Sequence, residues 1–161
     1  MIRDFDITIV GGGHSGLFLA GALAGQGWRL ALVDPQPLVP PDGPPDGRNL
    51  ALVRSTREVA ERYGLWSALA PLACPVEAVR VRERPGGARL ATDMQELDGR
   101  PFAYGIEHGA LRRALAEALA GLEHRPSFFQ SRLEGLARDP DVRLLTLSDG
   151  SRLATRLVVG A

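Results

Sequence analysis

The sequence lacks lysine, has a single cysteine and contains no apolar run long enough to cross a membrane. One cysteine, Cys74, excludes an internal disulfide and cannot form a metal site alone, so we expect a reducing compartment and no metal. The first residues lead almost directly into an apolar run and do not form a signal-peptide pattern. These absences predict a cytoplasmic protein.

All 19 basic residues are arginine, and 19 acidic residues balance them, so the formal net charge is zero. Arginine without lysine can indicate binding to phosphate or nucleic acid. We favour codon bias instead, because Ala, Gly and Pro are also abundant and no basic stripe or net positive charge accompanies the arginines. Nucleic acid is therefore not an expected partner.

The N-terminal part of the chain carries the most informative pattern. Residues 5–10 form an apolar, β-branched run that is typical of a buried parallel strand. Helical periodicity follows over residues 17–26, in a helix expected to begin near His14 and Ser15, and a second apolar strand over 29–33 ends in Asp34. Between the first strand and the helix stands a turn with G-x-G-x-x-G spacing, Gly11-Gly12-Gly13-His14-Ser15-Gly16. This order, with an acid about 20 residues further on, predicts a dinucleotide-binding βαβ unit.

The positions of this motif have separate physical roles. Gly11 permits the tight turn, Gly13 lets the backbone approach a pyrophosphate, and Gly16 removes a side chain where helix and strand touch. The N–H groups at the start of the helix, near Ser15, point at that pyrophosphate together with the positive end of the helix dipole. Asp34 can accept hydrogen bonds from an adenosine ribose, and the absence of an arginine directly after it disfavours NADP here. A glycine turn without a ligand is the alternative.

After this unit the pattern is less regular. A proline- and glycine-rich segment over 35–47 predicts an extended surface loop. A helix follows, in which Ser55 and Glu58 have the spacing of a capping box and Gly64 can end the helix.

From residue 76 the period changes to two, which predicts strands over 76–81, 88–92 and 102–106, with a turn at Pro85-Gly86-Gly87 between the first two. Such antiparallel strands inside a parallel α/β pattern indicate a second sheet. The remaining predicted elements are an amphipathic helix with Leu111, Leu115, Leu119 and Leu122 on its apolar side, strands near 128–129 and 132–137, and a hairpin of 142–147 with 153–159. A buried strand at the end of the chain predicts that the polypeptide is incomplete at its C-terminus.

Several segments in this order resemble the flavin-dependent aromatic hydroxylases, within them most closely the ubiquinone-biosynthesis hydroxylase group, relatives of para-hydroxybenzoate hydroxylase. They are the glycine motif, Asp34, Arg48-Asn49-Leu50-Ala51-Leu52, Leu65-Trp66 after Gly64, Gly105-Ile106-Glu107-His108 with Leu111 and Leu115, and Leu157-Val158-Val159-Gly160-Ala161. The resemblance implies an α/β fold: a Rossmann-like FAD-binding βαβ fold with an antiparallel insert, cut short at the C-terminus. Residues 1–161 would be the N-terminal part of the FAD-binding domain, with 76–106 contributing to a second, substrate-side sheet.

The resemblance also implies roles for residues. FAD would be bound through Gly11, Gly13, Ser15 and Gly16 at the pyrophosphate and through Asp34 at the adenosine ribose. Arg48 matches an arginine near the FAD phosphates and ribityl chain. His108 stands where the family often has Gln, Asn or Arg at the cofactor, and Arg112 follows on the same helix; an exposed residue at a helix start is the alternative for His108. His14 receives no proton-transfer role.

The implied activity is that of an FAD-dependent monooxygenase that hydroxylates a small aromatic or quinone-precursor ring with NAD(P)H and O2. We nominate no catalytic side chain, because the cofactor carries the chemistry. A non-catalytic nucleotide-binding fragment is one alternative. An NAD-dependent dehydrogenase is another, which the insert disfavours. A prenylated substrate would bring the protein to the inner membrane surface, although no amphipathic segment has a basic enough polar face to argue for this.

Overall fold

The computed structural model describes residues 2–41, 43, 47–82, 89–96 and 98–161. The chain divides into two compact units. The first unit comprises residues 1–44 and 112–161, and the second unit comprises residues 45–111.

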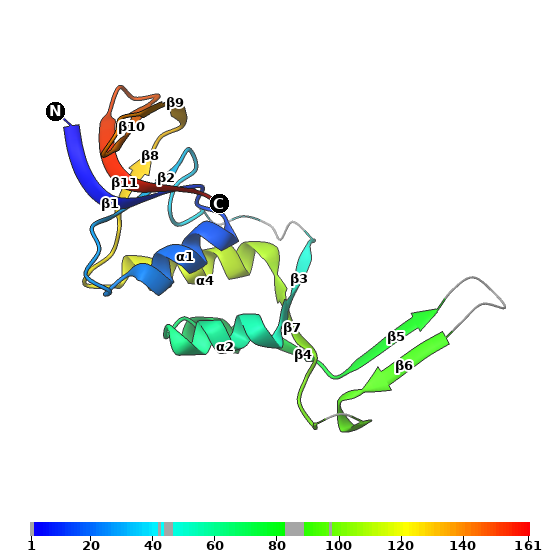
Figure 1. Ribbon diagram of the computed structural model, residues 1–161. Coiled ribbons are helices and arrows are strands. Elements are labelled where there is room, and N and C mark those ends of the chain that lie inside the picture. Colours follow the sequence, from blue (N-terminus) through cyan, green and yellow to red (C-terminus); the bar gives the residue numbers. More distant parts are fainter. Residues whose placement is uncertain (1, 42, 44–46, 83–88, 97) are drawn as a thin grey trace. The chain divides into compact units, whose positions relative to one another are not determined.

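The first unit is built on one six-stranded sheet with the strand order β8-β2-β1-β11-β10-β9 (Figure 1). The strands are β1 (Ile2–Val10), β2 (Leu30–Asp34), β8 (Ser127–Gln130), β9 (Leu133–Arg138), β10 (Arg143–Leu147) and β11 (Arg152–Gly160). The first four in this order run parallel, and β9 and β10 are antiparallel additions at one edge. The predicted C-terminal hairpin is confirmed, and its second strand also pairs with β1.

Helix α1 (His14–Leu23) connects β1 to β2, so the predicted βαβ unit is confirmed. Helix α4 (His108–Ala120) begins in the second unit and continues into the first, where it lies on the same face of the sheet as α1 (Figure 1). A buried cluster combines residues from β1, β2, β8, β10 and β11: Phe5, Ala31, Val33, Phe129, Leu145, Leu147 and Leu153.

Two helix predictions for these segments were wrong in detail. α1 ends at Leu23 rather than near residue 26, because Ala24 is extended with ψ 137° and Gly25 has φ +79°. Leu122 was expected on the apolar side of α4, but α4 ends at Ala120 and the Leu122 side chain is 37% exposed.

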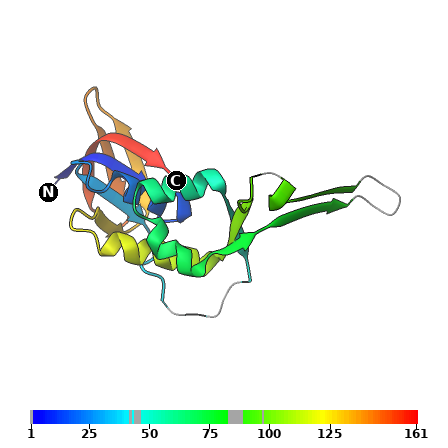
Figure 2. The same cartoon turned by 90° about the horizontal axis from the view of Figure 1, so that it is seen from below.

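The second unit contains a three-stranded sheet of order β3-β7-β4 and a separate hairpin (Figures 1 and 2). The sheet strands are β3 (Asn49–Val53), β4 (Cys74–Val76) and β7 (Ala103–Glu107), and the hairpin joins β5 (Ala78–Arg82) to β6 (Arg89–Asp93). Helices α2 (Arg54–Arg62) and α3 (Trp66–Leu69) follow β3, and single 3-10 turns occupy Ala70–Leu72 and Met94–Glu96.

The predicted single strand over 76–81 is two strands with different partners. The Phe102 backbone N–H donates to the Val76 carbonyl, whereas the Met94 N–H donates to the Glu77 carbonyl, so the chain changes partner at residue 77. The predicted turn Pro85-Gly86-Gly87 lies outside the described residues. The strand over 49–53 was not predicted.

The predicted capping box at Ser55 was wrong. β3 leads directly into α2, whose N-cap is Val53, so Ser55 lies inside the first turn, and Val53 makes no side-chain cap hydrogen bond within the described residues. Arg54 instead anchors this start: its guanidinium binds Asp98 with two bonds of 2.7 and 2.9 Å. Gly64 ends the helix as predicted, with φ +72° and a Schellman pair of backbone bonds, Gly64 N to Glu61 O and Leu65 N to Ala60 O.

No helix among the described residues combines the length and apolar content that a membrane crossing requires.

The ion pair of Asp6 with Arg29 makes stability depend on pH. The Asp6 carboxylate accepts hydrogen bonds from the Arg29 side chain and from its backbone N–H, and these hold the pKa of Asp6 below its ordinary value. A carboxyl with a lowered pKa in the folded state stabilises above its unfolded pKa, about 3.9, and this contribution is lost as the pH falls through the folded-state value. We therefore expect D6N to show a smaller loss of melting temperature between pH 6 and pH 3 than wild type. An equal loss in both proteins would contradict this.

Candidate dinucleotide site

The glycine turn is held against the ends of three strands. The Gly11 N–H donates to the Val33 carbonyl at 2.8 Å, and Gly11 has φ +118°, a conformation that favours glycine. A Cβ on Gly11 would lie 2.0 Å from the Ala161 carbonyl oxygen. A Cβ on Gly16 would lie 1.8 Å from the Gly11 carbonyl oxygen, so here the helix must touch the turn. The expected roles of these two glycines therefore have a direct steric basis.

Gly13 differs from its neighbours. Its backbone angles, φ −73° and ψ −173°, suit any residue, and a Cβ built on it would meet no heavy atom of the described residues within 4 Å. No steric contact with the described residues therefore requires glycine at this position. The space in front of Gly13 fits a bound group that approaches the backbone closely.

This open space adjoins the start of α1. Gly13 is the N-cap of this helix, and glycine has no side chain that could accept a hydrogen bond from the first-turn N–H groups. The first bond of the helix runs from the Leu17 N–H to the Gly13 carbonyl, and Ser15 is exposed in the first turn. A helix cannot bond the N–H groups of its first turn internally, and the positive end of its dipole lies there. This end of α1 suits an anion such as pyrophosphate.

Asp34 is fixed at the carboxyl end of β2. Its Oδ2 accepts the Gly12 N–H at 2.6 Å, and its Oδ1 accepts the Gln36 N–H at 2.7 Å. Gly12 has its own steric requirement, because a Cβ there would lie 2.9 Å from the Asp34 Cβ. A carboxylate has about four acceptor sites, so both oxygens retain capacity for ribose hydroxyls. The role of Gly12 was not predicted from the sequence, because no spacing rule signals it.

Loss of this carboxylate should loosen the turn. In D34A the Gly12 N–H loses its charged acceptor, and we expect a destabilisation of about 1.5 kcal/mol. D34N keeps an acceptor oxygen and should lose less. Urea unfolding of the two variants measures the difference, and equal stability of D34A and wild type would contradict the contact.

Arg112 comes from α4 and binds backbone carbonyls. Its Nε donates to the Gly12 carbonyl at 3.2 Å and its Nη2 to the Pro37 carbonyl at 3.1 Å. The side chain thus ties the glycine turn to the loop that follows β2. Only tertiary structure brings residues this far apart in sequence together, so the sequence could place Arg112 on the helix but not identify its partners.

Arg48 and His108 lie together in the second unit. Pairing of β3 with β7 brings them side by side, with Arg48 Nη2 3.0 Å from His108 Nδ1 and the His108 N–H donating to the Arg48 carbonyl at 3.0 Å. A guanidinium only donates, so Nδ1 accepts and the ring proton is on Nε2. The start of α4 beside them is capped by Glu107, which accepts the N–H groups of Gly109 and Ala110 at 3.0 and 2.6 Å.

A cavity of about 430 Å³ opens in the first unit, where β1, β2 and β8 end. This is the edge of a parallel sheet at which α/β proteins bind ligands. The cavity is lined by Val10, Gly11, Val33, Pro35, Ser131, Arg132, Leu133 and Ala161. Of these residues, only Gly11 was predicted from the sequence to have a role in binding. Among the described residues, no group of three or more His, Cys, Asp or Glu side chains could hold a metal ion.

The predicted residues thus fall into two sets. The first unit contains Gly11, Gly13, Ser15, Gly16, Asp34 and Arg112, and the second unit contains Arg48 and His108. Within each unit the structure brings the predicted residues together.

Comparison with known proteins gives matches along nearly the whole chain. A family model described as "FAD binding domain" matches residues 4–161. Ubiquinone hydroxylase UbiL of Rhodospirillum rubrum is 34% identical over 160 residues, which cover 97% of this chain and 36% of the relative. Ubiquinone hydroxylase UbiM of Neisseria meningitidis is 28% identical over 162 residues, covering 97% and 35%. Because the matches cover 36% and 35% of these two relatives, the chain spans about a third of their length.

Solved structures of similar fold also match along nearly the whole chain. PqsL, a probable FAD-dependent monooxygenase from Pseudomonas aeruginosa, superposes with a TM-score of 0.78 at 25% identity, covering 99% of this chain and 42% of that chain. The same protein has also been solved in complex with 2-aminobenzoylacetate.

Proposed function

Because the chain belongs to the FAD binding domain family, we propose that its parent protein is a flavin-dependent monooxygenase that hydroxylates an aromatic or quinone-precursor ring, with NAD(P)H as reductant and O2 as oxidant. The observation that carries the cofactor part is the open space at Gly13, where no heavy atom of the described residues lies within 4 Å of a built Cβ. The ring substrate is supported by relatives named as ubiquinone hydroxylases.

We assign the binding of the ADP part of FAD to the first unit. The pyrophosphate lies against Gly11, Gly13, Ser15 and Gly16 at the start of α1, where N–H groups and the helix dipole favour it. Asp34 accepts from the adenosine ribose. Arg112 is a positioning residue, because its guanidinium binds the Gly12 carbonyl in the glycine turn and the Pro37 carbonyl in the loop after Asp34.

The pair of Arg48 and His108 serves the phosphates and ribityl chain of the same cofactor. The Arg48 guanidinium supplies positive charge and hydrogen-bond donors, and His108 accepts one of them, which orients the guanidinium. When bound, FAD supplies the redox and oxygen-transfer chemistry, so this part of the protein needs no nucleophile or metal of its own.

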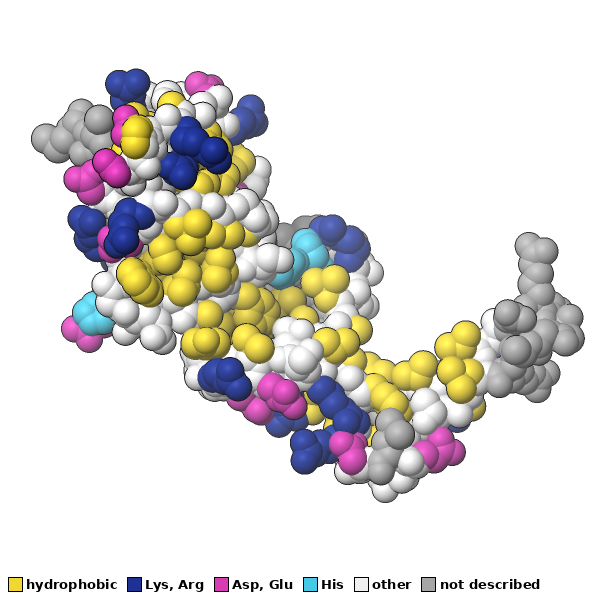
Figure 3. Space-filling view, viewed as in Figure 1, with side chains coloured by type: hydrophobic (Ala, Val, Ile, Leu, Met, Phe, Trp, Pro, Cys, Tyr) yellow, Lys and Arg dark blue, Asp and Glu magenta, His cyan; other side chains and the backbone are white. Residues whose placement is uncertain are grey.

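The segment 76–106 is proposed to contribute to the substrate side. β5 and β6 form a two-stranded hairpin, which is marginal in water without a covering partner. Val81 and Leu90 lie opposite each other on this hairpin and are 52% and 62% exposed. Hydrophobic side chains are visible along the hairpin in the space-filling view (Figure 3). This apolar stripe suits packing against further parts of a substrate-binding sheet. We also propose a cytoplasmic location, with contact to the inner membrane surface only where the substrate carries a prenyl tail.

The full-length parent protein, loaded with FAD, provides the test of activity. With NADH or NADPH, a quinone-precursor phenol and ¹⁸O2, we expect a product that contains one oxygen atom from O2, detected by mass spectrometry. Oxidation of NAD(P)H without oxygen incorporation would contradict the proposal. The alternative of a fragment without activity concerns residues 1–161 alone, and NAD(P)H oxidation by that chain above the rate of an equal concentration of free FAD would exclude it.

A further inference from the structure

The cavity at the ends of β1, β2 and β8 has apolar walls and one charged side chain. Val10, Val33, Pro35 and Leu133 contribute the walls, and Arg132 is the one charged residue among those that line it. A flat, uncharged ring would bury its faces against such walls without leaving a carboxylate or ammonium of the protein desolvated.

Arg132 is held in place through its backbone. The Arg132 N–H donates to the Ser148 Oγ at 3.0 Å, and the Ser148 N–H donates to the Arg132 carbonyl at 2.9 Å. Ser148 Oγ also lies 2.9 Å from the Oγ of the buried Ser131. The position from which the Arg132 side chain extends is therefore rigid.

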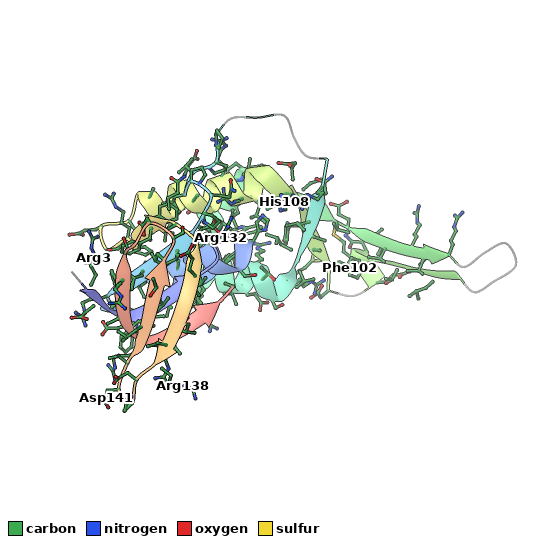
Figure 4. All side chains as sticks on the ribbon, turned by 90° about the horizontal axis from the view of Figure 1, so that it is seen from above. Arg3, Phe102, His108, Arg132, Arg138 and Asp141 are labelled. Atoms are coloured by element: carbon green, nitrogen blue, oxygen red, sulfur yellow. The ribbon has the colours of Figure 1, made fainter. Side chains whose placement is uncertain are left out.

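The guanidinium of Arg132 is not used by the fold. The side chain is exposed, and within the described ranges of the chain it has no hydrogen bond, ion pair or ring contact. Arg138, at the opposite end of β9, is also exposed but does not line the cavity (Figure 4). Arg132 directly precedes β9 and Arg138 ends it, and the two arginines differ in that only Arg132 lines the cavity.

The cavity adjoins the residue proposed to hold the ribose. β2 pairs with β8 so that Asp34 lies opposite Gln130, and the Ser131 N–H donates to the Asp34 carbonyl at 3.0 Å. A base attached to a ribose at Asp34 would therefore meet the segment 131–133. Pyrophosphate at the glycine turn, ribose at Asp34 and base in the cavity follow one another in the covalent order of FAD.

We infer that Arg132 stacks its guanidinium on the adenine ring of FAD in this cavity, opposite the apolar walls. The inference rests on the proposed cofactor. A guanidinium is planar and stacks on aromatic faces, and each base offers such a face. Arg132 acts here as a specificity residue for the adenosine half of the cofactor, and it does not touch the reacting flavin ring.

Replacement series at residue 132 separate stacking from charge. We measure FAD and FMN affinity of the purified chain by isothermal titration calorimetry. R132Q should bind FAD roughly three- to tenfold more weakly, because the planar guanidinium that stacks on the adenine face is lost. R132Y keeps a flat stacking surface and should retain most of the wild-type affinity, whereas R132K keeps the charge without the plane and should resemble R132Q. FMN has no adenosine, so its affinity should be the same in all four proteins.

The matched control is R138Q, which should bind FAD like wild type. Wild-type FAD affinity in R132K together with weakened FAD affinity in R132Y would show a charge contact to phosphate and overturn the inference. Wild-type FAD affinity in R132Q would also overturn it. If wild type itself binds no FAD, the proposed function fails first. If wild type binds FAD and R132Q is unchanged, only the inference about Arg132 fails.

Discussion

Replacement of Gly13 by leucine is expected to abolish FAD binding and to leave the folded chain intact. The backbone angles at Gly13 suit leucine, and the new Cβ would meet no atom of the described residues within 4 Å. The side chain would then occupy the space in front of α1 that we assign to the pyrophosphate. We expect FAD affinity to fall at least about 100-fold, which corresponds to about 2.7 kcal/mol, with little change in melting temperature.

The control for this variant is G43L. Gly43 also has open space around a built Cβ, but it lies in the loop after β2 rather than at the helix start. G43L should keep both stability and FAD affinity. An FAD affinity in G13L equal to that of G43L would show that no ligand occupies the space at Gly13.

Replacement of Gly16 by alanine, unlike that of Gly13 by leucine, is expected to destabilise the fold. The added Cβ would overlap the Gly11 carbonyl oxygen at 1.8 Å, and that oxygen belongs to backbone that is held by the Gly11 bond to Val33. The turn must therefore move away from the strand ends. We expect a destabilisation of about 3 kcal/mol, at the upper end of overpacking effects, together with loss of FAD binding.

Two other glycine-to-alanine variants serve as controls for this loss of stability, which urea unfolding measures. In G13A the Cβ meets open space, and in G121A it would lie at an ordinary 3.6 Å from the Ala118 and Glu117 carbonyl oxygens. Both should remain within about 1 kcal/mol of wild type. Stability of G16A close to that of G13A would contradict the close contact of helix and turn.

Much of the first unit could be predicted because its signals are local. The apolar strand, the glycine turn, the helix and the acid at Asp34 follow one another within the βαβ unit, and the family match confirms the resemblance drawn from them. The hairpin of 142–147 with 153–159 was found for the same reason. Each of these elements depends on neighbours in sequence, which patterns of period and turn residues can detect.

Features that depend on distant residues could not be predicted. The capping box at Ser55 failed because Arg54 and a distant Asp98 fix the start of α2, and the strand over 49–53 was missed because its partner β7 lies far along the chain. The bonds of Arg112 to the glycine turn and the cavity at Arg132 have the same origin. In the candidate site, sequence located the glycines and the acid, and only the structure showed that Gly13 alone among Gly11, Gly12, Gly13 and Gly16 has no steric reason to be glycine.

The most direct measurement is the visible absorption spectrum of wild type and G13L after incubation with FAD and desalting, with circular dichroism to confirm that both are folded. We expect wild type to retain the flavin bands and folded G13L to lack them. A folded wild-type chain that emerges colourless, or a G13L chain that retains as much flavin as wild type, would contradict it.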